Sequence, residues 1–98
     1  MIEVRKTAEF RTWLRRLSDE TAVARIVSRI RRLELGNFGD VRSVGAGVME
    51  LRIDYGPGYC VYYVKRGASI VILLCGGDKR TQQRGIERAK EKADEQDD

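Results

Sequence analysis

The chain has 98 residues, of which 42% are hydrophobic and 35% are charged, and this fits one globular domain with a modest core. It contains no histidine and only two cysteines, which excludes histidine-based catalysis and argues against a structural zinc site. No apolar run approaches the roughly 18 residues that span a membrane, and the N-terminus lacks a signal-peptide pattern, so we expect a cytoplasmic protein.

Charge is unevenly distributed along the chain. The first 90 residues hold 18 of the 19 basic residues and 10 of the 15 acidic ones. A basic body favours a nucleic acid or an acidic protein as partner, although an ordinary solvated surface has the same composition. We expect residues 1–93 to form the domain and the acidic residues 94–98 to form a disordered tail.

The N-terminal third predicts a strand and a helix hairpin. Residues 2–6 alternate in polarity, and Thr7 can cap a helix with apolar residues at helical spacing from Phe10 to Leu17. Ser18 or Asp19 can cap the next helix, over residues 20–35. Its expected buried stripe is Ala22, Val23, Ile26, Val27, Ile30 and Leu33. A row of arginines on another side, Arg25, Arg29 and Arg32, can follow phosphates, bind an acidic partner or simply solvate the helix.

Residues 38–46 are rich in glycine and predict a connector. Residues 48–55, 59–65 and 69–75 then predict three antiparallel strands, because short β-rich runs alternate with Gly and Pro turns. The expected sheet has four strands, with Ile53 opposite Val61 and Cys60 diagonal to Arg52. One face is buried and the other is polar and exposed, the polar residues being Glu50, Arg52, Asp54, Cys60 and Tyr62. An ordinary solvated face with an ion pair remains the alternative to a site.

The two cysteines are expected to be free thiols, with Cys75 in the core. Gly76 and Gly77 predict a turn into a last helix. The basic residues that follow, with a helix N-terminus, suggest an anion site, although a well-capped turn explains the same pattern.

Four motifs, LGNFGD, GVMELRI, GPGY and CGGDK, together resemble the RelE/ParE superfamily of type II toxin–antitoxin modules. The resemblance covers about residues 4–90 and is strongest to the phage-related HigB-like branch, the addiction-module killer proteins. It implies an α+β fold of the RelE type: an N-terminal strand, a helix hairpin, a three-stranded antiparallel meander and a C-terminal helix.

The same resemblance implies a ribosome-dependent mRNA endonuclease without metal or other cofactor. In this class the 2′-hydroxyl attacks the adjacent phosphate, and a cognate antitoxin, often of helix-turn-helix type, blocks the toxin. Arg52 matches a basic position for stabilising phosphate charge, and Lys79 matches a second basic position that can do the same or act as an acid. Tyr62 is expected to stack on a base or orient the ribose. The expected RNA-binding residues are Arg42, Arg80, Gln82 and Arg84.

Two residues depart from the family pattern. Cys60 stands where the family usually has Arg, and cysteine cannot supply the charged donor fork that suits phosphate, so we expect reduced or lost nuclease activity. Gly85 stands where the family often has Asp. The alternatives are a gyrase-poisoning toxin like the ParE branch and a catalytically disarmed domain that only binds its antitoxin.

Overall fold

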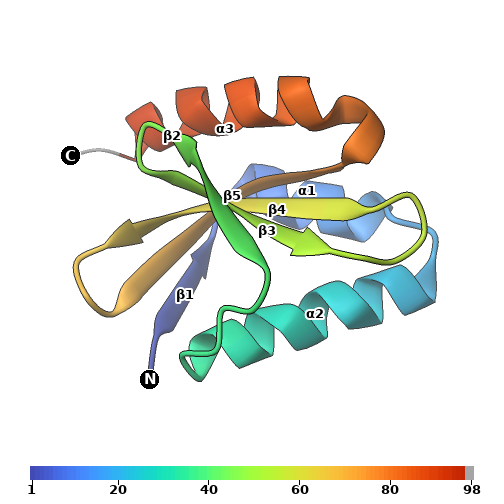
Figure 1. Ribbon diagram of the computed structural model, residues 1–98, viewed down its shortest axis with the longest axis horizontal. Helices are drawn as coiled ribbons and strands as arrows, with labels where there is room; N and C mark the ends of the chain where they lie inside the picture. Colours follow the sequence, from blue (N-terminus) through green and yellow to red (C-terminus); the bar gives the residue numbers. More distant parts are fainter. Residues whose placement is uncertain (97–98) are drawn as a thin grey trace.

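Five strands form one sheet through the middle of the computed structural model, which describes residues 1–96 (Figure 1). The strand order is β1-β5-β4-β3-β2, with β1 parallel to β5 and every other pair antiparallel. In chain order the elements are β1 (Glu3–Lys6), α1 (Ala8–Arg16), α2 (Glu20–Glu34), β2 (Val41–Gly45), β3 (Val48–Ile53), β4 (Tyr59–Arg66), β5 (Ile70–Asp78), a 3-10 turn (Lys79–Thr81) and α3 (Gln82–Glu95). The α+β class is confirmed, with five strands and three α-helices.

The helices cover both faces of the sheet. Helices α1 and α2 pack on one face and α3 on the other, which gives three layers (Figure 1). The core between the sheet and the helix hairpin contains Phe10, Ile26, Leu33, Leu51 and Tyr63 among its buried residues. The core beneath α3 contains Cys60, Tyr62, Leu74, Cys75 and Ala89 among others.

The helix hairpin follows the sequence prediction closely. Thr7 accepts a hydrogen bond from the backbone N–H of Phe10, and Asp19 caps α2 through two backbone N–H groups. Gly36, with a φ of +91°, follows the end of α2 in the left-handed conformation that favours glycine. Val27, which was expected in the buried stripe, is instead 40% exposed.

The expectation of a glycine-rich connector over residues 38–46 is wrong. Its second half forms the edge strand β2, which pairs with β3 so that Arg42 lies opposite Glu50. The turn between the two strands contains three successive residues with positive φ, Gly45, Ala46 and Gly47. The sheet therefore has five strands rather than four.

The predicted Gly76–Gly77 turn is also wrong, because β5 continues to Asp78. A Cβ atom on Gly76 would lie 2.3 Å from the ring of Trp13, far inside van der Waals contact. Gly76 is thus a strand residue that lets the indole of α1 lie directly against the backbone.

The β3–β4 register differs from the prediction by two residues. Ile53 pairs with Tyr59, and Arg52 lies directly opposite Cys60 rather than diagonal to it. A shift of two leaves each side chain on its predicted face. The face is not open, however, because α3 covers Glu50, Cys60 and Tyr62, which are 0%, 5% and 0% exposed.

The end of the chain is helical for longer than expected. Helix α3 continues to Glu95 and so includes the first two residues of the predicted tail. The last two, Asp97 and Asp98, lie outside the described residues. Within residues 1–96 no helix is both long and apolar enough to cross a membrane.

Candidate functional site

A groove of about 440 Å³ is lined by residues of β2, β3, β4 and the start of α3 and by the loops between them. The structure brings together here five of the candidate catalytic and RNA-binding residues: Arg42, Arg52, Cys60, Lys79 and Gln82. The other lining residues are Asp40, Ile53, Asp54, Gly58 and Tyr59. We call this surface the β3–β4 groove.

Sheet pairing and one loop contact place the three cations of the groove. Arg42 and Arg52 lie on adjacent strands, β2 and β3. The backbone N–H of Lys79 donates a 2.8 Å hydrogen bond to the carbonyl of Gly58, which ties the end of β5 to the β3–β4 loop. Arg42 and Lys79, which are 37 residues apart in the sequence, thus line the same groove.

The carboxylates around the groove have different partners. Asp40 forms an ion pair with Arg52, in which Oδ1 of Asp40 lies 2.8 Å from Nη2 of Arg52. The acids on the predicted face of Arg52 are Glu50 and Asp54, whereas Asp40, which precedes the unpredicted strand β2, was not singled out from the sequence. The carboxylate of Asp54 makes no hydrogen bond or ion pair with any of residues 1–96, so it is available to a ligand.

Beneath the groove, the carboxylate of Glu50 is fully buried and receives three side-chain hydrogen bonds. Arg42 Nε donates to one oxygen at 2.7 Å. The Tyr62 hydroxyl and the Gln82 amide nitrogen donate to the other, at 3.0 and 2.9 Å. Burial by itself raises the pKa of Glu50, but the hydrogen bonds from Arg42, Gln82 and Tyr62 outweigh it and hold the pKa below its usual value. Glu50 is therefore an anchored anion and a poor proton acceptor.

Tyr62 and Cys60 were expected on an exposed face, but both side chains are buried. The phenol of Tyr62 is buried under α3 and bonded to Glu50, so its ring is not free to stack on a base. Cys60 lines the groove, but burial and the nearby charge of Glu50 raise the pKa of its thiol to about 11. A thiol with that pKa is almost entirely protonated at pH 7 and is a weak nucleophile.

The remaining predicted RNA-binding residues lie outside the lining of the groove. The side chain of Arg80 is 85% exposed, with Asp78 4.0 Å away, and Arg84 is exposed on the first turn of α3. The sequence left an anion site and a well-capped turn open at this point, and the structure has the capping box of such a turn, in which Asp78 and Thr81 bond to each other's backbone N–H groups. No group of three or more His, Cys, Asp or Glu side chains in residues 1–96 can hold a metal ion.

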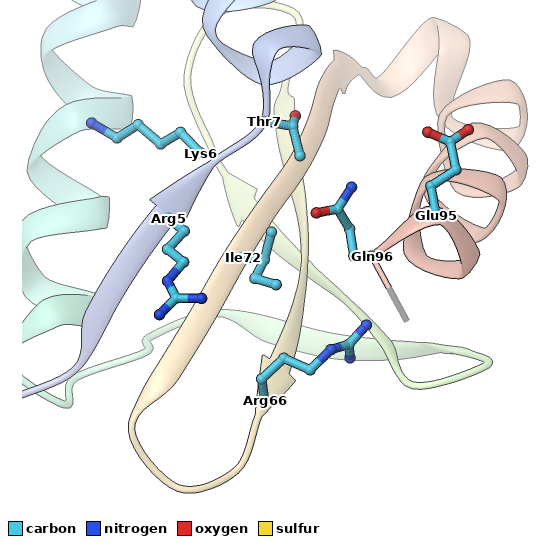
Figure 2. Close-up of a pocket in the computed structure, with 7 residues that line it drawn as sticks. All are labelled: Arg5, Lys6, Thr7, Arg66, Ile72, Glu95 and Gln96. Carbon is cyan, nitrogen blue, oxygen red and sulfur yellow. The ribbon is translucent and has the colours of Figure 1, made fainter. Parts of the chain in front are cut away.

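A second hollow, of about 500 Å³, lies at the β1 edge of the sheet (Figure 2). Arg5 and Arg66 lie on either side of Ile72, while Lys6 extends away toward α2 (Figure 2). Arg5 is paired with Glu3, and within residues 1–96 none of the polar residues that line this hollow is buried. It has fewer fixed polar groups than the β3–β4 groove, which is the better candidate for a site.

Comparison with known proteins identifies the family. The family described as phage derived protein Gp49-like (DUF891) matches residues 12–96. The chain is also 51% identical over 89 residues to an uncharacterized protein of Haemophilus influenzae, covering 91% of this chain and 90% of the relative. The chain therefore belongs to the phage-derived Gp49-like family, a family of toxin-like proteins.

Proposed function

We propose that this Gp49-like protein is the toxin of a type II toxin–antitoxin module and cleaves mRNA on the ribosome in the β3–β4 groove. The observation that carries the proposal is the convergence of Arg42, Arg52 and Lys79, from three separate segments, on one groove. Fixed cations around a small concave surface suit the charge of an RNA backbone. The toxin-like family supports the same reading and implies an antitoxin as partner.

The chemistry suited to these side chains is internal transfer at phosphorus. The ribose 2′-oxygen forms a bond to the adjacent phosphorus while the bond from phosphorus to the 5′-oxygen breaks, leaving a 2′,3′-cyclic phosphate and a 5′-hydroxyl. Negative charge grows on the non-bridging oxygens during this step. Arg52 lies on the groove wall, where its guanidinium stabilises that charge, and Asp40 fixes its orientation through their ion pair.

Proton transfer in this scheme falls to two exposed side chains. Asp54 is the groove carboxylate without a partner among residues 1–96, so we assign it the 2′-hydroxyl proton. Lys79, whose backbone is bonded to Gly58 and which also lines the groove, donates a proton to the leaving 5′-oxygen. Glu50 is excluded from the first role because its oxygens are buried and bonded.

Cys60 weakens this site. It lies directly opposite Arg52 in the sheet and lines the groove, where an arginine would add a further donor fork for the phosphate. This observation favours a second candidate, a disarmed domain that binds its antitoxin and no longer cuts RNA. The two candidates differ in one measurable property, RNA cleavage.

The test compares mRNA cleavage by the wild type and the Cys60→Arg variant in a purified translation system. We expect little cleavage by the wild type and at least tenfold more by the variant, with products ending in cyclic phosphate. Arg52→Ala in the variant background should abolish cleavage, whereas Arg66→Ala, which removes a charge from the other hollow, should not.

Cleavage that is equally strong in both proteins would show that Cys60 is harmless. Absence of cleavage in both would refute the nuclease proposal. Tight antitoxin binding would then leave the disarmed domain, and stabilised gyrase–DNA cleavage complexes would point to the ParE-like activity.

A further inference from the structure

Glu50 is the one fully buried charged residue in the part of the chain that the structure describes, and the chemistry proposed above does not use it directly. Its carboxylate joins three elements. Arg42 comes from β2, Tyr62 from β4 and Gln82 from the first residue of α3. Two of these three donors, Arg42 and Gln82, also line the β3–β4 groove.

The carboxylate determines what Arg42 can present to a ligand. Its Nε is committed to Glu50 at 2.7 Å, while its two terminal nitrogens make no hydrogen bond with residues 1–96. The side chain is 46% exposed. An arginine held by Nε and open at its terminal nitrogens is oriented in advance for a phosphate oxygen.

The effect on Gln82 is more specific, because a carboxylate can only accept hydrogen bonds. The amide nitrogen of Gln82 must therefore be the end that lies 2.9 Å from Glu50. The carbonyl oxygen, Oε1, is then the other end, and it receives no hydrogen bond from residues 1–96. In a groove whose cations only donate, Gln82 supplies a neutral acceptor.

We propose that Glu50 is a positioning residue, which holds Arg42 toward a phosphate and turns the Gln82 carbonyl oxygen so that it accepts a hydrogen bond from the 2′-hydroxyl of a second ribose, not the one whose 2′-oxygen attacks. The proposal rests on RNA binding in the β3–β4 groove. It assigns the recognition of RNA over DNA to Gln82, since only RNA carries the 2′-hydroxyl donor.

The first test uses the unaltered protein. Hydrogen exchange of side-chain amides by NMR should show Gln82 at least tenfold slower than its neighbour Gln83, whose amide is exposed and 3.5 Å from Glu87. The Nε–H of Arg42 should likewise exchange more slowly than that of exposed Arg84. Equal exchange within both pairs would overturn the anchoring role.

The second test measures binding to a short RNA and to the DNA of the same sequence. The wild type should favour RNA, and Glu50→Gln should reduce that preference at least fivefold, because a neutral amide no longer fixes which end of Gln82 is presented. Glu3→Gln, which neutralises the exposed partner of Arg5 at the far edge, is the matched control and should leave the preference unchanged.

A further variant tests the same preference without changing the buried carboxylate, so the test does not depend on the folding of Glu50→Gln. Gln82→Met removes the acceptor at a half-buried position while Arg42 and Tyr62 still bond to the carboxylate. It should lose the same preference. If the wild type favours RNA and both variants keep the same preference for RNA over DNA, the positioning role is overturned while the proposed function stands. A wild type without RNA preference, yet with a protected Gln82 amide, overturns the RNA recognition.

Discussion

Tyr62 and Tyr63 allow a direct test of the buried cluster, because they are adjacent in β4, fully buried and on opposite faces of the sheet. The hydroxyl of Tyr62 donates to Glu50, whereas the hydroxyl of Tyr63 has no hydrogen-bond partner among residues 1–96. Replacing each by Phe removes the same atom at the same burial. A hydrogen bond to a charged group is worth about 1.5–3 kcal/mol, and a buried unsatisfied polar group costs about 1–3 kcal/mol.

We therefore expect Tyr62→Phe to lower the free energy of unfolding by about 1.5–3 kcal/mol, and Tyr63→Phe to leave it unchanged or raise it by about 1 kcal/mol. Urea denaturation at pH 7 measures both. With a slope of roughly 1 kcal/mol per molar for a small domain, the midpoint of Tyr62→Phe should fall by about 1.5–3 M. Equal midpoints for the two variants would refute the argument that the Glu50 cluster stabilises the fold.

Other perturbations test separate parts of the structure. Glu50 has a lowered pKa in the folded state, so its contribution to stability is present above its ordinary pKa of 4.5 and is lost as the pH falls through the lowered value. Glu50→Gln should flatten that loss in acid denaturation, and an unchanged profile would contradict it. Gly76→Ala should lower the free energy of unfolding by about 1–3 kcal/mol through overpacking against Trp13. In a Trp13→Ala background most of this loss should vanish, and additive losses in the double variant would exclude the ring contact. Neither Cys60 nor Cys75 should react with iodoacetamide at pH 8 in the folded protein, because their pKa values are raised to about 11 and about 12. Rapid labelling without urea would contradict this and show that the thiols are accessible.

The elements with clear periodicity could be predicted from the sequence. The apolar stripe and the cap of α2, and the β-rich runs of β4 and β5, are local signals that packing did not override. β2 could not be found this way. It is a five-residue strand at the edge with the sequence VRSVG, and its pairing depends on β3, which comes later in the chain.

Only the residues of the candidate site that reach the surface of the groove could be predicted. Arg52, Lys79 and Gln82 were recognised from motifs, and the fold brings them together. The burial of Glu50 was not predictable from the alternation in β3, because that pattern does not show whether a helix covers the polar face. Gly85 was a signal that could have been used: a Cβ there would lie 3.0 Å from the ring of Tyr62, so a glycine early in α3 marks close packing on the sheet.

Formation of the groove and docking of α3 are coupled through the same residues. The segment that carries α3 delivers Lys79 and Gln82 to the groove wall, and the small residues Ala89 and Ala93 let the helix lie close to the sheet. Arg88 adds an attachment outside the core through its 2.6 Å ion pair with Glu9 of α1. If α3 loosened, Glu50 would lose Gln82 and gain water, while the core between the sheet and the helix hairpin would keep its packing. The shape of the groove therefore depends on the docking of α3, which fixes Gln82 on Glu50 and Lys79 at the groove.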